Sequence, residues 1–133
     1  GLVGSEMCIR DRYKTIRKTM KWNQSDTFAY YMDEFFEENE DRKKIPVYSG
    51  VIKYFPDAIK ELAKVSYVGN EQHNPGKPLH WDRSKSGDEL DALMRHLLEA
   101  GEIDDDNIRH SAKVAWRALA HLQKELEKEK NNE

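Results

Sequence analysis

The side chains best suited to chemistry are concentrated between Asp88 and Leu122. Carboxylates, imidazoles and cations occur there at short spacings, across two helix-like patterns and an acidic turn: Asp91, Arg95, His96, Glu99, Glu102, Asp104, His110 and Lys113. Two amphipathic helices with a short connection fold against each other, which brings such groups close together. Carboxylates and imidazoles beside fixed cations are what a metal-assisted phosphate site requires. An ordinary solvated helix hairpin is the open alternative.

The spacing of the charged residues places several of them on one helix stripe. Asp91, Arg95 and Glu99 follow one another at intervals of four residues, and Glu102 comes three residues later. His96 precedes Glu99 by three residues, so these two side chains can also meet. The alternative is a surface ladder of ion pairs, which stabilises a helix by a few tenths of a kcal/mol per pair.

The acidic turn from Glu102 to Asp106 offers oxygen ligands, which suit Mg²⁺ or Mn²⁺. It is not an EF-hand loop, because Asn107 replaces the required glycine and Lys113 replaces the final bidentate acid. A simpler interpretation is that Asp105 and Asp106 favour the positive N-terminus of the next helix. That interpretation does not explain Glu102 at the C-terminal end of the preceding helix, where an anion is unfavourable.

A long polar segment, Asn70 to Ser86, carries a second group of candidates: His73, His80 and Trp81. A loop of this length in a small domain is often functional. Trp81 is suited to stacking on a nucleobase, or alternatively to packing the loop onto the core. The two histidines give only a weak zinc signal, because they have no cysteine partners.

The elements that must position these residues are helices, and the sequence predicts an all-α fold of about four helices. Apolar periodicity predicts helices from Thr27, from Pro56 to a stop at Gly69, from about 87 to 100 and from about 107 to 128. A charged connector is expected at 39–44. The last two helices are expected to bury leucine-rich faces: Leu90, Leu93, Met94, Leu97 and Leu98, then Ile108, Ala112, Ala115, Trp116, Leu119, Leu122 and Leu126.

The composition limits the classes of function. The chain has 133 residues, 38% hydrophobic and 35% charged, with a net charge of −3. Such a charge argues against a general nucleic-acid partner, and no apolar run approaches membrane-spanning length. The low apolar content favours a homodimer, because association would bury further surface. A cytoplasmic location is the default expectation.

The first twelve residues resemble translated sequencing adapter rather than protein sequence. Leu2 to Asp11 match, codon by codon, one reading frame of a transposon-end oligonucleotide. A short natural terminus is the alternative, and either interpretation predicts disorder and no role in the fold. We therefore expect four parts: 1–12 adapter-like, 13–49 an arm and an aromatic-striped helix, 50–128 the main helical domain, and 129–133 a charged tail. The only cysteine, Cys8, lies in the first part, so the remaining chain has no thiol chemistry.

Several short blocks resemble one family. They are Gly69-Asn-Glu-Gln-His73, Leu79-His80-Trp81, Asp91-Ala-Leu-Met-Arg95-His96-Leu97, Ala100-Gly101, Asp104 and His110-Ser-Ala-Lys-Val-Ala115. Together they resemble the phage-associated dATP/dGTP diphosphohydrolase N-terminal domain family, over about Gly50 to Leu126. Better-understood proteins that carry the same activity name resemble the MazG-like all-α pyrophosphohydrolases. The metal ligands of those enzymes form ExxE and ExxD pairs. This chain has Glu99-x-x-Glu102 for the first pair and His110-x-x-Lys113 in place of the second.

The resemblance implies metal-dependent hydrolysis of a purine deoxynucleoside triphosphate to the monophosphate and pyrophosphate, in a phage-infected bacterial cell. The implied roles divide among the candidates. Asp91, Glu99, Glu102 and Asp104 would hold Mg²⁺ or Mn²⁺, and His96 and His110 would move a proton. His73, Trp81, Arg95 and Lys113 would bind substrate. The rival interpretation is a non-catalytic helical interaction or accessory protein.

Overall fold

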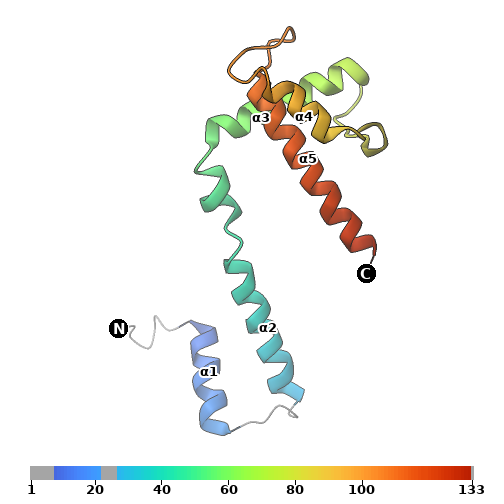
Figure 1. Cartoon of the computed structure of the whole chain (residues 1–133). Coiled ribbons are helices and arrows are strands. Elements are labelled where there is room, and N and C mark those ends of the chain that lie inside the picture. The colour runs from blue at the N-terminus through green and yellow to red at the C-terminus, as the bar shows by residue number, and fades with distance from the viewer. Residues whose placement is uncertain (1–7, 22–26, 133) are drawn as a thin grey trace. The chain divides into compact units, whose positions relative to one another are not determined.

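The chain folds as α-helices joined by loops, as the sequence predicts (Figure 1). A computed structural model describes residues 8–21 and 27–132. The helices are α1 (Ile9–Met20), α2 (Thr27–Lys43), α3 (Pro56–His73), α4 (Glu89–Leu97) and α5 (His110–Asn131). The chain divides into two compact units, 1–51 and 52–133, which are described separately below. None of the described helices combines the length and apolar content needed to cross a membrane.

The first unit pairs α1 with α2 around one buried aromatic contact. Tyr13 is 8% exposed, and its ring lies 5.0 Å from that of Phe36 between centroids. The Tyr13 hydroxyl donates to the Ala29 carbonyl at 3.2 Å. Only part of the aromatic stripe of α2 is therefore core, since Tyr31 and Phe35 stay more than half exposed.

Two boundaries in this unit differ from the sequence prediction. Residues 9–12, expected to be disordered, form the first turn of α1, and residues 1–7 lie outside the described residues. The Arg12 amide donates to the Cys8 carbonyl, so the helical ladder extends N-terminally from the Tyr13 contact. Residues 39–43, predicted to be a connector, form the last turns of α2, because Arg42 and Lys43 suit a helix C-terminus as well as they suit a loop.

Helix α3 begins with Pro56 at its first turn, as predicted, but does not stop at Gly69. It continues to His73, so this histidine lies on a helix rather than in the loop. The helical ladder runs on through Asn70, whose carbonyl accepts from the Asn74 amide at 2.7 Å. Glycine disfavours a helix interior by only about 1 kcal/mol, and the buried Asn70 side chain favours continuation.

Asn70 also fixes the loop that follows α3. Its Nδ2 donates to the Lys77 carbonyl at 3.0 Å, and its Oδ1 accepts from the His80 amide at 3.2 Å. The loop, 74–88, is therefore folded back over the end of α3. At its other end, the Ser86 hydroxyl donates to the buried Glu89 carboxylate, and the Lys124 ammonium lies 3.5 Å from Glu89 Oε1. These contacts attach both ends of the loop to helices.

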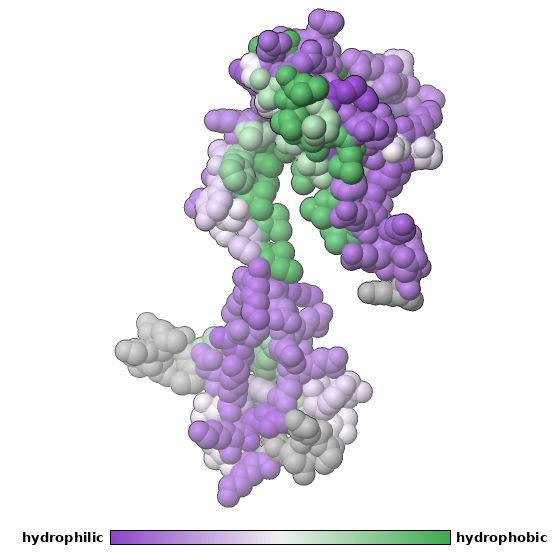
Figure 2. All heavy atoms as spheres, in the orientation of Figure 1, coloured by the Kyte–Doolittle hydropathy of each residue, from purple (hydrophilic) through white to green (hydrophobic). Residues whose placement is uncertain are grey.

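Helices α3 and α4 both pack on α5, and small residues fill the closest contacts. Ala92, Ala112 and Ala120 are almost fully buried, as is Ile108 just before α5. The predicted leucine-rich core faces are wrong in large part. Within the described chain these side chains remain between 45% and 82% exposed: Leu90, Met94, Leu97, Leu98, Leu119, Leu122 and Leu126. Of the predicted α5 face, Ile108 and Ala112 at its start are buried, whereas Leu119, Leu122 and Leu126 further along are not covered by the described residues. Figure 2 shows apolar side chains gathered along one side of α5.

Candidate functional site

The acidic turn between α4 and α5 is a compact folded loop. Gly101, with φ of +96°, ends the turns after α4 in a left-handed conformation that suits glycine. The Asp104 amide donates to the Ile108 carbonyl at 2.9 Å, and Asp106 Oδ1 accepts from the Ile108 amide at 3.1 Å. The backbone thus holds both aspartates toward the first turns of α5.

Lys113 of α5 is the cation that neutralises these aspartates. Its ammonium lies 2.6 Å from Asp104 Oδ2 and 2.7 Å from Asp106 Oδ2. The hydrogen bond from Lys113 is the largest cause of the lowered pKa of Asp104. Burial alone would lower the pKa of Lys113, but its hydrogen bonds to the two aspartates outweigh burial and raise it. Lys113 therefore fixes the loop on α5 through its two ion pairs with Asp104 and Asp106, which we call the Lys113 lock.

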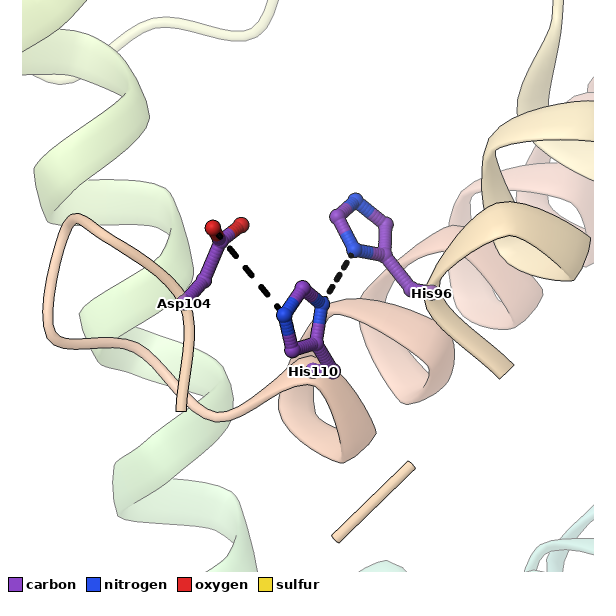
Figure 3. A group of neighbouring side chains, drawn as sticks. All are labelled: His96, Asp104 and His110. Carbon is purple, nitrogen blue, oxygen red and sulfur yellow. Dashed lines mark hydrogen bonds and ion pairs between the residues drawn. The ribbon is translucent and has the colours of Figure 1, made fainter. Parts of the chain in front are cut away.

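Two histidines meet beside this lock. The Nδ1 atoms of His96, from α4, and His110, from α5, are 2.9 Å apart. His110 is 5% exposed and lies between His96 and Asp104 (Figure 3). Its Nε2 lies 4.0 Å from Asp104 Oδ1, and its Nδ1 lies 3.7 Å from Glu99 Oε2. Burial, followed by the charge of Lys113, lowers the pKa of His96 and favours its neutral form.

A pocket of about 540 Å³ opens beside the cluster, within the second unit. One wall comes from the end of α3 and the folded loop, including His73, His80 and Trp81. A second wall comes from His96, Lys113 and Arg117, and Trp116 of α5 joins Trp81 in the first wall. The volume falls within the range of small-molecule sites, about 300–1,000 Å³. The pocket therefore connects an aromatic wall with the histidine and lysine cluster.

The aromatic wall is built from two tryptophans. The rings of Trp81 and Trp116 meet edge to face with centroids 5.6 Å apart, and the Trp116 indole donates to the Ser66 hydroxyl at 2.9 Å. The Arg83 guanidinium lies 4.2 Å from the centre of the Trp81 ring and covers one of its faces. Trp81 thus packs the loop onto α5 and leaves at most one face for a ligand.

A family model described as "dATP/dGTP diphosphohydrolase, N-terminal" matches residues 37–133. The chain belongs to this family. The match begins within α2, so it extends further toward the N-terminus than the sequence blocks from Gly50 indicated. No curated protein sequence and no solved structure shows a significant match to the chain. The matched region of this chain contains both the pocket and the histidine cluster.

The structure brings together only some of the predicted site residues. His96, Asp104 and His110 form the one group of possible metal ligands found in the described part of the chain. Glu99 borders it through His110, whereas Asp91 and Glu102 do not join it. His73, Trp81 and Lys113 line the pocket, and their role in substrate binding stays a prediction.

One predicted cation lies outside the pocket, and one cation that was not among the predicted site residues lines it. Arg95, predicted to bind substrate, is mostly exposed, pairs with Asp88 at 3.0 Å and does not line the pocket. Arg117 lines the pocket, is half-buried and makes no ion pair with a carboxylate among the described residues, although its charge helps to lower the pKa of Asp88. Its guanidinium lies 5.6 Å from the centre of the Trp116 ring. The sequence signal for Arg117 was its place on the His110 face of α5, two turns along the helix.

The donor set of the cluster decides which kind of metal it fits. Two imidazoles and a carboxylate suit Mn²⁺, Fe²⁺, Co²⁺ or Zn²⁺ better than Mg²⁺, which prefers oxygen ligands and bound water. The separation of 2.9 Å between the Nδ1 atoms is close to the roughly 3.0–3.4 Å that separates neighbouring ligands at metal–nitrogen bonds of about 2.1 Å. The cluster therefore fits a divalent ion, and it fits a transition metal best.

Proposed function

We propose that this domain hydrolyses purine deoxynucleoside triphosphates to the monophosphate and pyrophosphate, with the nucleotide held in the pocket between α3, the folded loop and α5. The observation that carries the proposal is the meeting of an aromatic wall and a cationic, histidine-lined wall in one cavity of about 540 Å³. The family match supports the substrate class. A site of this composition suits a ligand with one flat apolar end and one anionic end.

The phosphate end of the nucleotide belongs, in this proposal, beside Arg117. The charge of Lys113 is already matched by Asp104 and Asp106, so an added anion gains little from it. Arg117 has no such partner, and its planar guanidinium can bind two phosphate oxygens at once. Lys113 then acts on the substrate indirectly, by fixing the loop that carries Asp104.

The reacting end lies, in this proposal, at His96, which lines the pocket and contacts His110. His96, His110 and a neighbouring carboxylate would hold a divalent ion, which when bound supplies a water of lowered pKa and neutralises developing charge. Asp104 Oδ1 lies 4.0 Å from the outer nitrogen of His110, where a small side-chain shift would let it accept that N–H and orient the ring. The base end is assigned to the apolar lining around Val65, Val68 and Leu79, because the Arg117 guanidinium already lies 5.6 Å from the centre of the Trp116 ring.

An assay of pyrophosphate release tests the proposal. Wild-type protein is incubated with each of the four deoxynucleoside triphosphates and with Mn²⁺, Co²⁺ or Mg²⁺. Arg117→Gln removes a charge-assisted contact of about 1.5–3 kcal/mol and should lower kcat/KM for dATP or dGTP about 10- to 150-fold. Arg109→Gln is the matched control, because Arg109 is exposed and does not line the pocket. Equal losses in the two variants would contradict the placement of the phosphates.

A second candidate function is a non-catalytic interaction module, and one observation favours it. The apolar side chains of α4 and α5 remain exposed in the described chain, and such faces commonly mark binding surfaces. In that case the Lys113 lock and the histidine pair only tie α4, α5 and the acidic turn together. Wild-type protein that releases no pyrophosphate with any of the ions would favour this alternative.

A further inference from the structure

We infer that a transition-metal ion binds on the Nδ1 atoms of His96 and His110 with Glu99 as the third protein ligand, while Asp104 orients His110 from outside the metal. This inference deepens the proposed function, because it names the ion class and ligand set of the same site. It rests on the geometry around one buried ring, and its test does not require turnover.

The first step is that one imidazole offers only one nitrogen to one ion. The two nitrogens of His110 face different neighbours, with His96 Nδ1 at 2.9 Å from its Nδ1 and Asp104 Oδ1 at 4.0 Å from its Nε2 (Figure 3). An ion shared by the two histidines therefore lies on the Nδ1 side. Asp104 Oδ1 is nearest to the Nε2 atom of His110, so Asp104 is better placed to contact that outer nitrogen than to bind an ion on Nδ1.

The second step identifies the carboxylate on the correct side. Glu99 Oε2 lies 3.7 Å from His110 Nδ1, the same atom that faces His96. Glu99 follows α4 directly, in the turn whose amides bond back to His96 and Leu97, and its side chain is 57% exposed. An exposed glutamate at this distance can close onto an ion by a change of rotamer alone.

The third step concerns Asp104, whose other contacts suit an orienting role. Its Oδ2 is already held by Lys113 at 2.6 Å, and its Oδ1 faces the Nε2 of His110. A carboxylate that accepts from the outer N–H of a metal-bound histidine fixes the tautomer and the ring orientation. With Nε2 protonated, His110 presents the unprotonated Nδ1 that a metal ligand needs.

Titration with Co²⁺ tests the ligand set, because its visible absorption reports both the ion's presence and its ligands. The wild type should bind Co²⁺, and Zn²⁺ should displace it, whereas a tenfold excess of Mg²⁺ should not. His96→Asn and Glu99→Gln should each weaken Co²⁺ binding more than about 100-fold or change the shape of the spectrum. Asp104→Asn should weaken binding about 10- to 100-fold and leave the spectral shape unchanged.

The test does not depend on a variant of the buried His110, which could fail to fold, because the variants of the other residues have a matched control. Asp105→Asn, in the same acidic turn but exposed, should bind Co²⁺ like the wild type. The inference is overturned if the wild type binds no Co²⁺, if Mg²⁺ displaces it readily, or if Asp104→Asn alters the spectrum while Glu99→Gln does not. Co²⁺ binding without pyrophosphate release would instead refute only the proposed function.

Discussion

Removal of the Lys113 ammonium should destabilise the second unit strongly. Lys113→Met leaves Asp104 and Asp106 without their shared cation, at side-chain exposures of only 28% and 20%. Breaking a fully buried pair costs about 3–5 kcal/mol, and the partial exposure of these groups reduces this to about 2 kcal/mol. For a unit of this size the melting temperature should fall by about 8–16 °C, as measured by circular dichroism. Lys128→Met, an exposed lysine on the same helix, is the matched control.

The pH dependence of the fall in melting temperature shows whether the lost ion pairs of Lys113 cause it. The pKa of Asp104 is lowered in the folded protein, chiefly by Lys113. A lowered carboxyl pKa gives stability that is present above the unfolded value of about 3.9 and is lost as the pH falls through the folded value. The difference in melting temperature between wild type and Lys113→Met should therefore become smaller below about pH 4. A difference that stays constant from pH 7 to pH 3, or one no larger than that of the control, would refute the Lys113 lock.

Two further predictions concern stability and association. Gly69→Ala should stabilise the chain by about 0.4–1 kcal/mol in thermal melts, because an added Cβ meets nothing within 4 Å inside α3, and a loss would show strain there. We also propose that a second copy of the chain covers the apolar side of α5 formed by Leu119, Leu122 and Leu126. Sedimentation should then show a dimer at micromolar concentration that Leu122→Glu dissociates and Gln123→Glu does not, and a monomeric wild type would contradict this.

Local signals in the sequence predicted the helices well where one strong residue decides a boundary. Pro56 begins α3 because its fixed φ and missing amide suit a first helical turn. The prediction that Gly69 ends α3 was wrong. Its modest helix penalty was outweighed by the buried contacts of Asn70 in the next position. The prediction that the leucine faces of α4 and α5 are buried in the core was also wrong in large part. Periodicity shows that a face is apolar, but it does not show whether this chain or a partner covers it.

The sequence predicted which residue types belong to the candidate site, but not which of their atoms face one another. The sequence placed His96, Asp104 and His110 among the candidates because they flank one short turn. Which nitrogen of His110 faces which neighbour depends on side-chain geometry, and no spacing rule encodes it. Arg117 was missed as a pocket residue because its position depends on how the loop after α3 packs against α5, a contact between segments far apart in the sequence.

A product-resolved assay of the wild-type protein with dGTP and dATP, run with the ion that binds most tightly, decides whether this domain hydrolyses them as proposed. Hydrolysis between the α- and β-phosphates should give the deoxynucleoside monophosphate and pyrophosphate in equal amounts. It should be faster for the purine than for the pyrimidine substrates and should be sharply reduced in Arg117→Gln. Release of the diphosphate and inorganic phosphate, or no turnover with Mn²⁺, Co²⁺, Zn²⁺ or Mg²⁺, would contradict the proposed diphosphohydrolase site.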